Sequence, residues 1–187
     1  MQESVELPEN KEKETNENET EPLNCSWTLW CHENKSQNWK ADGYRKICVI
    51  NTVQDFWGVF NNLAMLGNVM QRSIFLFRRN IVPIWEDPEN KKGGINSMRL
   101  QQQTNTTKYL ETFANLSMLI VGEALIDRQE DMEDISGISF SCKNNDPYVK
   151  IWHKTKNSKF LDKIVSSKHM KKYQKCVFKY IQPKPQY

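Results

Sequence analysis

The chain has 187 residues and a mass of 22.1 kDa, which suits one globular domain whose core needs no disulfide or metal. No apolar run approaches the roughly 18 residues of a membrane-spanning helix, and the acidic N-terminus is unlike a signal peptide. We therefore expect a cytoplasmic protein, with nuclear entry left open. The five cysteines are odd in number and include no Cys-x-x-Cys pair, so they predict reduced thiols and neither disulfides nor a metal site.

Charge divides the chain into two parts. Residues 1–20 hold seven glutamates, two lysines and no aromatic residue, a composition that predicts a disordered acidic tail. Residues 21–187 carry 24 basic against 16 acidic side chains and form the predicted folded domain. This excess favours an anionic partner such as nucleic acid. Many soluble domains are equally basic, so charge alone does not decide the function.

The first half of the predicted domain contains paired strands and one helix. Thr52 and Asp55 have the spacing of a capping box, and the apolar residues that follow recur at helical spacing. Trp39 lies in a polar stretch and is expected on a loop. The predicted elements are strands at residues 26–31 and 46–51, a helix from residue 53, and short strands at residues 74–77 and 81–84.

The second half predicts two helices, one of them the longest, and four further strands after a turn at Gly93-Gly94. With about eight strands that arrive in pairs, and three helices, the sequence predicts an α+β fold with a mainly antiparallel sheet. The predicted elements are a strand at residues 95–101, a helix at 109–121, strands at 135–143 and 149–154, a helix at 160–165 and a strand at 176–181.

Motifs of enzymes are absent from the sequence, which contains no GxSxG, GxxxxGK[ST], HExxH or GxGxxG. The histidines lie in polar settings and are predicted to be surface residues, and a group of acids is predicted to be solvated in a charged loop. We therefore expect no catalysis, no cofactor and no metal. These residues are His32, His153 and His169, and Asp131, Glu133 and Asp134.

The Trp85-Glu86 pair in an irregular segment offers a flat π surface beside a carboxylate that accepts hydrogen bonds. This combination suits a flat ligand rich in N–H donors, such as the Watson–Crick edge of guanine. A methylated, positively charged guanine would add a cation–π attraction. The alternative is that Trp85 packs in a core and that Glu86 is only solvated.

From Pro22-Leu23 through Thr52-Val53-x-Asp55-Phe56-Trp57 and Pro83-x-Trp85-Glu86-Asp87 to Ile151-Trp152, the order of motifs resembles the translation initiation factor 4E family, the mRNA cap-binding proteins. The resemblance covers roughly residues 21–181, and the T-V-x-D-F-W and P-x-W-E-D blocks are specific together. The matching motifs are Pro22-Leu23, Trp27-x-x-Trp30, Trp39, residues 51–57, residues 83–87, Asn90 to Gly94, Gly122-Glu123, Gly137 and Ile151-Trp152.

The resemblance implies a curved antiparallel sheet of about eight strands, backed on its convex side by three helices. It also implies a 7-methylguanosine cap in the concave face, with the base sandwiched between Trp39 and Trp85. Glu86 would accept hydrogen bonds from the base, and Trp152 would contact the methyl group. Without the resemblance, core and ligand roles for Trp152 are evenly balanced. Trp27 and Trp30 are expected to be structural.

The phosphate-binding residues of the family are partly replaced in this chain. Lys143 stands where the family usually has an arginine, Tyr148 replaces a usual lysine, and Ile95 replaces another arginine. Alternation along the strand places Lys150 on the same face as Trp152, so Lys150 could take over part of the phosphate contact. The alternative is that Lys150 is a solvated strand lysine.

The resemblance also implies a dorsal surface that binds a helical Tyr-x-x-x-x-Leu-apolar motif in scaffold and inhibitor proteins. Pro22, Leu23, Val53 and Trp57 match this surface, and Ala114 stands where the family generally has a leucine. Phe56 and Trp57 point to different faces of the helix, so one of the two should be core and the other should not.

The sequence thus predicts a monomeric, non-enzymatic protein that binds the mRNA cap and acts in translation initiation by recruiting a scaffold partner. Two alternatives stay open. The chain could be a repressor paralogue that binds caps, or a protein-interaction module whose cap pocket has decayed. The retained aromatic residues and Glu86 argue against the decayed pocket.

Overall fold

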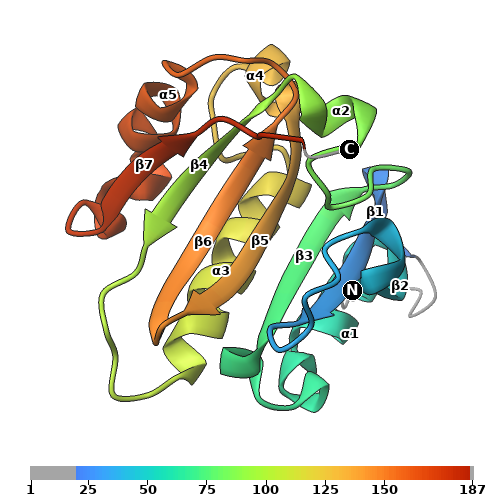
Figure 1. Cartoon of the computed structure of the whole chain (residues 1–187). Helices are drawn as coiled ribbons and strands as arrows, with labels where there is room; N and C mark the ends of the chain where they lie inside the picture. The colour runs from blue at the N-terminus through green and yellow to red at the C-terminus, as the bar shows by residue number, and fades with distance from the viewer. Residues whose placement is uncertain (1–19, 186–187) are drawn as a thin grey trace, which may run out of the picture.

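The computed structural model describes residues 20–185, which form a curved sheet of seven strands with helices on one side (Figure 1). Neighbouring strands are all antiparallel, in the order β2-β1-β3-β5-β6-β4-β7. The predicted α+β class is therefore confirmed, while the acidic tail lies outside the described residues apart from Thr20. The strands are β1 (Pro22–Glu33), β2 (Arg45–Thr52), β3 (Arg72–Arg78), β4 (Gly94–Arg99), β5 (Ile135–Lys143), β6 (Asp146–His153) and β7 (Val177–Ile181).

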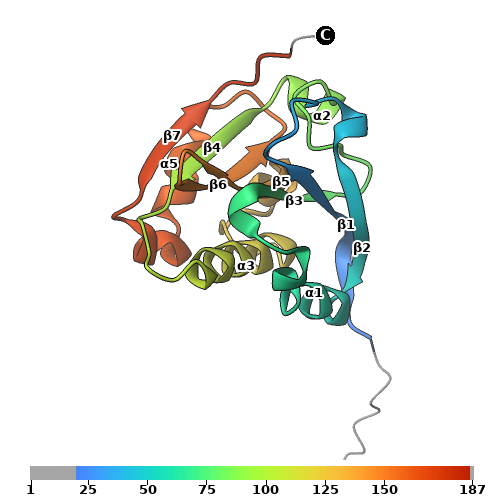
Figure 2. The same cartoon turned by 60° about the horizontal axis from the view of Figure 1, so that its bottom comes forward.

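Three helices cover one face of the sheet, which we call the helix-covered face; the other is the open face. Figure 1 shows α3 behind β5 and β6, and Figure 2 shows α1 beside α3. Residues 20–185 contain two α-helices more than the three expected, because α2 and α4 are too short to show a helical period. The helices are α1 (Val53–Phe60), α2 (Pro88–Lys91), α3 (Thr107–Val121), α4 (Gln129–Asp134) and α5 (Phe160–Ser166), with 3-10 turns η1 (Ala41–Gly43), η2 (Leu63–Leu66), η3 (Val69–Gln71) and η4 (Lys168–Tyr173).

The start of α1 confirms the predicted capping box. Thr52 Oγ1 accepts a hydrogen bond from Asp55 N at 3.0 Å, and Asp55 Oδ2 accepts one from Thr52 N at 3.1 Å. The longest helix, α3, has 15 residues, and no helix within residues 20–185 has the length and hydropathy of a membrane span. The five cysteines are free thiols, as predicted.

Alternation along the strands divides the apolar side chains between two clusters. On β3, Ile74 and Leu76 enter the main core under the helices, whereas Phe75 and Phe77 belong to a smaller cluster on the open face. Trp27 is fully buried in the main core, which confirms its predicted structural role. The smaller cluster consists of Phe75, Phe77, Ile81, Ile95 and Trp152, with Trp30, Tyr44, Trp85 and Ile181 packed around it.

Residues 81–84 form an irregular segment, so the strand predicted there is wrong. The carbonyl groups of Val82 and Ile84 accept hydrogen bonds from Asn90 Nδ2, each at 2.9 Å. Pro83 has no N–H for a strand ladder. A side chain therefore takes the place of a partner strand, which leaves seven strands among the described residues instead of the expected eight.

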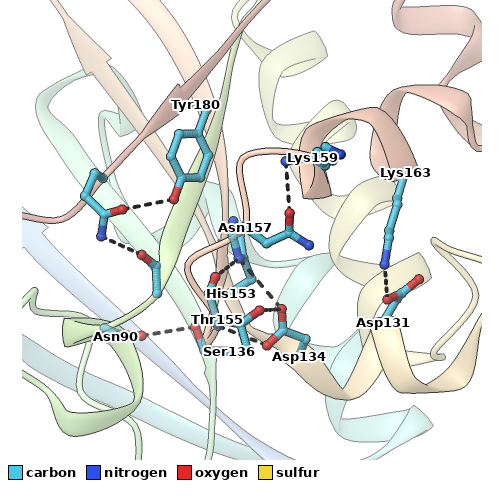
Figure 3. A network of polar contacts seen from close by, with 12 residues as sticks. Asn90, Asp131, Asp134, Ser136, His153, Thr155, Asn157, Lys159, Lys163 and Tyr180 are labelled. Carbon is cyan, nitrogen blue, oxygen red and sulfur yellow. Dashed lines mark hydrogen bonds and ion pairs between the residues drawn. The ribbon is translucent and has the colours of Figure 1, made fainter.

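Two histidines are buried, contrary to the prediction that they lie on the surface. His32 and His153 are each only 1% exposed, and His169 is half-buried. His153 Nδ1 donates a hydrogen bond to the Thr155 carbonyl at 2.8 Å (Figure 3), and its ring stacks on Phe160. Burial lowers the pKa of His153, so the neutral ring is favoured in the folded protein.

Two of the acids predicted to be solvated in a loop instead make structural contacts on α4. Asp131 is 8% exposed and pairs with Lys163 Nζ at 2.6 Å (Figure 3). Asp134 accepts hydrogen bonds from Thr155 N at 3.1 Å and from Thr155 Oγ1 at 2.7 Å. Glu133 is exposed, as expected. The contacts join α4 to α5 and to the end of β6.

Gly137 allows β5 to approach β3, and its replacement should destabilise the fold. A Cβ atom at Gly137 would lie 2.5 Å from the Phe77 ring and 2.8 Å from the Leu76 carbonyl oxygen. We expect Gly137→Ala to lower the free energy of unfolding by about 1–3 kcal/mol, because a backbone carbonyl cannot move aside. The matched control is Gly58→Ala on α1, where a Cβ would meet nothing within 4 Å.

Gly58→Ala should raise the free energy of unfolding by about 0.5–1 kcal/mol through helix propensity. Urea denaturation measures the free energy of unfolding of both variants. Equal effects of the two substitutions would contradict the close approach at Gly137.

Candidate functional site

A cavity of about 510 Å³ lies on the open face, a size typical of small-molecule sites. Its walls come from the loop with Trp39, the loop with Trp85, and strands β5 and β6. The structure brings together the six residues that the sequence placed in one ligand site. The predicted site residues that line it are Trp39, Trp85, Glu86, Lys143, Lys150 and Trp152, and the other lining residues are Asn34, Tyr44, Ser73, Phe75, Pro83, Ile84, Ser139, Ser141 and Cys142.

A buried amide fixes the loop that carries Trp85. Asn90, at 1% exposure, holds the carbonyl groups of Val82 and Ile84 through Nδ2, as described above. Its Oδ1 accepts a hydrogen bond from Ser136 Oγ on β5 at 3.0 Å (Figure 3). The loop is therefore tied to the sheet by polar groups that satisfy one another away from water.

Trp39 lies on the loop before η1 and is 48% exposed, as its polar surroundings predicted. One face of its ring stacks on His32, with ring centroids 4.0 Å apart and planes 17° apart. His32 Nε2 donates a hydrogen bond to the Asn38 carbonyl at 2.9 Å, and the Tyr44 ring lies 4.9 Å from His32. His32 thus supports the Trp39 loop from β1.

Trp152 belongs to a buried cluster and also lines the cavity. It is 5% exposed, packs edge-on against Phe77, and its Nε1 donates to Ser139 Oγ at 3.1 Å. It also lines the cavity and forms part of its floor. Trp85 and Glu86 are both half-buried, so Trp85 is neither a core residue nor a freely solvated one.

The cationic end of the cavity is formed by Lys143 and Lys150. Lys150 is half-buried on β6 directly opposite Ser139, which puts it on the open face as alternation predicted. Burial and the neighbouring Lys143 lower the pKa of Lys150. Ile95 is 2% exposed in the smaller cluster, and Tyr148 is half-buried.

A second candidate surface lies on the helix-covered side around α1. Phe56 is 3% exposed and Trp57 is 41% exposed, so Phe56 is the core residue of the pair. Pro22 is exposed and lies opposite Thr52, directly before Val53. The structure therefore places Pro22, half-buried Val53 and exposed Trp57 on one side of the molecule.

The neighbouring part of this surface comes from α3, which contacts α1 through Phe60 and Phe113, with ring centroids 5.8 Å apart. Ala114 is half-buried against the main core, and Met118, one turn later, is 39% exposed. Leu23 is half-buried and also packs against the main core. We call Pro22, Leu23, Val53, Trp57, Ala114 and Met118 the α1–α3 surface.

Comparison with known proteins identifies the family. The protein-family model described as eukaryotic initiation factor 4E matches residues 22–184 of this chain. The chain belongs to the eukaryotic initiation factor 4E family. Eukaryotic translation initiation factor 4E of Aplysia californica is 34% identical over 137 residues, which cover 70% of this chain and 60% of that protein. Factor 4E-1A of Danio rerio is 31% identical over 157 residues, which cover 78% of this chain and 71% of that protein.

Solved structures of the family share the fold of this member. Ascaris suum eIF4E-3, crystallised as a complex with the m2,2,7G cap, is 25% identical with a TM-score of 0.73. The match covers 90% of this chain and 94% of that chain. Against the Aplysia relative, in contrast, the chain spans less than two thirds of the relative's length.

Sequence reasoning missed three residues that shape the two candidate sites of this family member. His32 gave no signal, because its polar neighbours suggested the surface. Asn90 was noted only as part of a motif, and a buried amide has no periodic pattern. Met118 follows Ala114 by four residues on α3, so helical spacing could have placed it beside Ala114.

The Asn90 amide should be essential for the conformation of the Trp85 loop. Asn90→Ala leaves two carbonyls and the Ser136 hydroxyl without their partner, and we expect it to lower the free energy of unfolding by about 2–4 kcal/mol. Asn115→Ala, at an exposed position on α3, is the control and should change stability by less than about 0.5 kcal/mol. Urea unfolding measures both. An effect at Asn90 no larger than at Asn115 would show that the loop is held by other contacts.

Proposed function

We propose that this protein binds the 7-methylguanosine cap of mRNA and acts in translation initiation. The observation that carries the proposal is that Trp39, Trp85, Glu86 and Trp152 line one and the same cavity. The related Ascaris protein, of the same fold, was crystallised with a methylated cap. The mildly basic domain is consistent with an anionic RNA ligand.

In the proposed complex the methylated base stacks between Trp39 and Trp85. Base–aromatic stacking contributes about 1–3 kcal/mol per base, and the positive charge of the methylated ring adds a cation–π attraction. Glu86 accepts hydrogen bonds from the N–H groups of the base, and Trp152 contacts the methyl group from the floor. The two phosphate-facing lysines are Lys143 and Lys150. The protein thus acts by binding, without catalysis or a cofactor, and as a monomer.

A partner protein is proposed to bind the α1–α3 surface. Exposed Trp57 beside Val53 and Pro22 is suited to a helical segment with a Tyr-x-x-x-x-Leu-apolar motif. Because Ala114 is smaller than leucine and Met118 is flexible, we expect this surface to adapt to its partner more than a surface with leucine at residue 114 would. The partner is a scaffold initiation factor or an inhibitor that carries the same motif.

The cap proposal predicts selectivity for the methylated base. The protein should bind 7-methylguanosine triphosphate about tenfold or more tightly than GTP, because a desolvated cation–π contact contributes about 1–2 kcal/mol. Glu86→Gln should weaken binding of the methylated analogue roughly tenfold or more, since a hydrogen bond to a charged group contributes about 1.5–3 kcal/mol. Quenching of tryptophan fluorescence measures both.

Glu89→Gln is the matched control for Glu86→Gln. Glu89 is an exposed carboxylate three residues further on that pairs with Lys154 at 3.7 Å and does not line the cavity. Its substitution should leave affinity unchanged. Equal affinity of the parent protein for GTP and its methylated analogue would rule out the sandwich.

The partner proposal predicts that the two surfaces can be separated by mutation. Trp57→Ala should weaken the binding of a Tyr-x-x-x-x-Leu-apolar peptide by about 2 kcal/mol or more, as expected for an aromatic hot spot. It should leave affinity for the cap unchanged. Val165→Ala on α5, where the side chain is 40% exposed, is the control. Calorimetry with peptide and cap analogue measures both ligands. Loss of cap binding together with peptide binding would show that Trp57 supports the fold instead.

A further inference from the structure

The strand register places a row of polar and cationic residues across the open face, leading away from the cavity. Ser139 on β5 lies opposite Lys150 on β6, Lys150 lies opposite Ser97 on β4, and Ser97 lies opposite Lys179 on β7. Directly opposed residues share one face of a sheet. We call Lys150, Ser97 and Lys179 the lysine row; it runs from inside the cavity to the β7 edge of the sheet.

The two lysines of the row have no acidic partner among residues 20–185. None of the ion pairs between described residues involves Lys150 or Lys179. In contrast, Arg99, two residues after Ser97 on β4, pairs with Asp146 at 2.7 Å. Lys179 is exposed and Lys150 is half-buried. Desolvation, which lowers the pKa of Lys150, also makes a nearby anion more favourable there.

The row continues into the most basic part of the chain. Residues 150–184 contain eleven lysines and only one acid, Asp162. Neighbouring strands are about 4.8 Å apart, so the backbones of Lys150 and Lys179 lie about 10 Å apart across β4. Two flexible four-carbon side chains at this spacing suit successive phosphates of an extended strand better than a single compact anion.

We propose that the mRNA chain that follows the cap leaves the cavity across β6, β4 and β7, with the cap's triphosphate in contact with Lys150 and a phosphate of the following strand in contact with Lys179. This inference rests on the proposed cap-binding function, because the cap fixes the start of the strand between Trp39 and Trp85. Tyr148 lies two residues before Lys150 on β6, on the same face of the sheet, and is half-buried. Its ring could stack on a base of the RNA. A cationic groove with aromatic rings is the usual way to bind single-stranded nucleic acid.

The test compares two ligands on the full chain: 7-methylguanosine triphosphate and a capped RNA of eight nucleotides. Lys179→Gln should leave affinity for the triphosphate unchanged and should lower affinity for the capped RNA severalfold at low salt. The slope of log affinity against log salt should fall in magnitude by about 0.7, the value for one phosphate contact with a single strand. Lys150→Gln should weaken both ligands, and its effect on cap analogues should grow from one to three phosphates.

Lys175→Gln is the matched control, because Lys175 is an exposed lysine in the same basic segment but lies outside the row and before β7. Its substitution should leave both affinities and the salt slope nearly unchanged. Equal losses of affinity for the capped RNA in Lys175→Gln and Lys179→Gln would contradict the proposed path along the lysine row and would indicate a diffuse basic surface instead. No effect of Lys179→Gln on the capped RNA would also overturn the proposed path. Failure of the parent protein to bind the triphosphate is a separate result that contradicts the cap proposal itself.

Discussion

The core and the site of this protein both depend on the alternation of side chains along its strands. On β6, Val149 and Ile151 enter the main core, while Lys150 and Trp152 face the cavity. A slip of β6 by one residue would exchange these pairs. It would remove the aromatic floor of the cavity and place a lysine charge in an apolar core, which is costly without a partner. Because one register satisfies both faces, stability and ligand recognition constrain the same strand.

The features that could be predicted from the sequence are those with a local period or a fixed spacing. The apolar stripe of α3 and the capping box of α1 are set by residues a few positions apart, and both appear as expected. The same is true of alternation on β6, which placed Lys150 beside Trp152. The convergence of the Trp39 and Trp85 loops on one cavity has no local signal. It was expected only from the family resemblance, because it depends on the order of strands in the sheet.

The features that were missed are decided by groups far apart in the sequence. The segment at residues 81–84 is apolar enough for a strand, but its carbonyls find a donor in Asn90, which in turn requires Ser136 on β5. His32 has polar neighbours along the chain, yet its ring is covered by Trp39 and Tyr44. Burial of a polar residue depends on which ring or strand lies over it, and sequence neighbours carry little information about that.

In the proposed complex, the two ends of the cavity differ in how they recognise the cap. At the base end, recognition depends on geometry: two tryptophan rings and the Glu86 carboxylate are held by His32 and Asn90. At the phosphate end, the groups are lysines, which act as point charges without the bidentate geometry of arginine. Exposed Lys143 is screened by salt more than half-buried Lys150, so Lys150 carries more of the attraction as ionic strength rises. In the proposed complex, Ile95 and Tyr148 take the places of an arginine and a lysine that the family resemblance implies, so we expect them to change the strength and salt dependence of binding. In the proposed complex the base is chosen mainly by Trp39, Trp85 and Glu86, which lie on other segments of the chain.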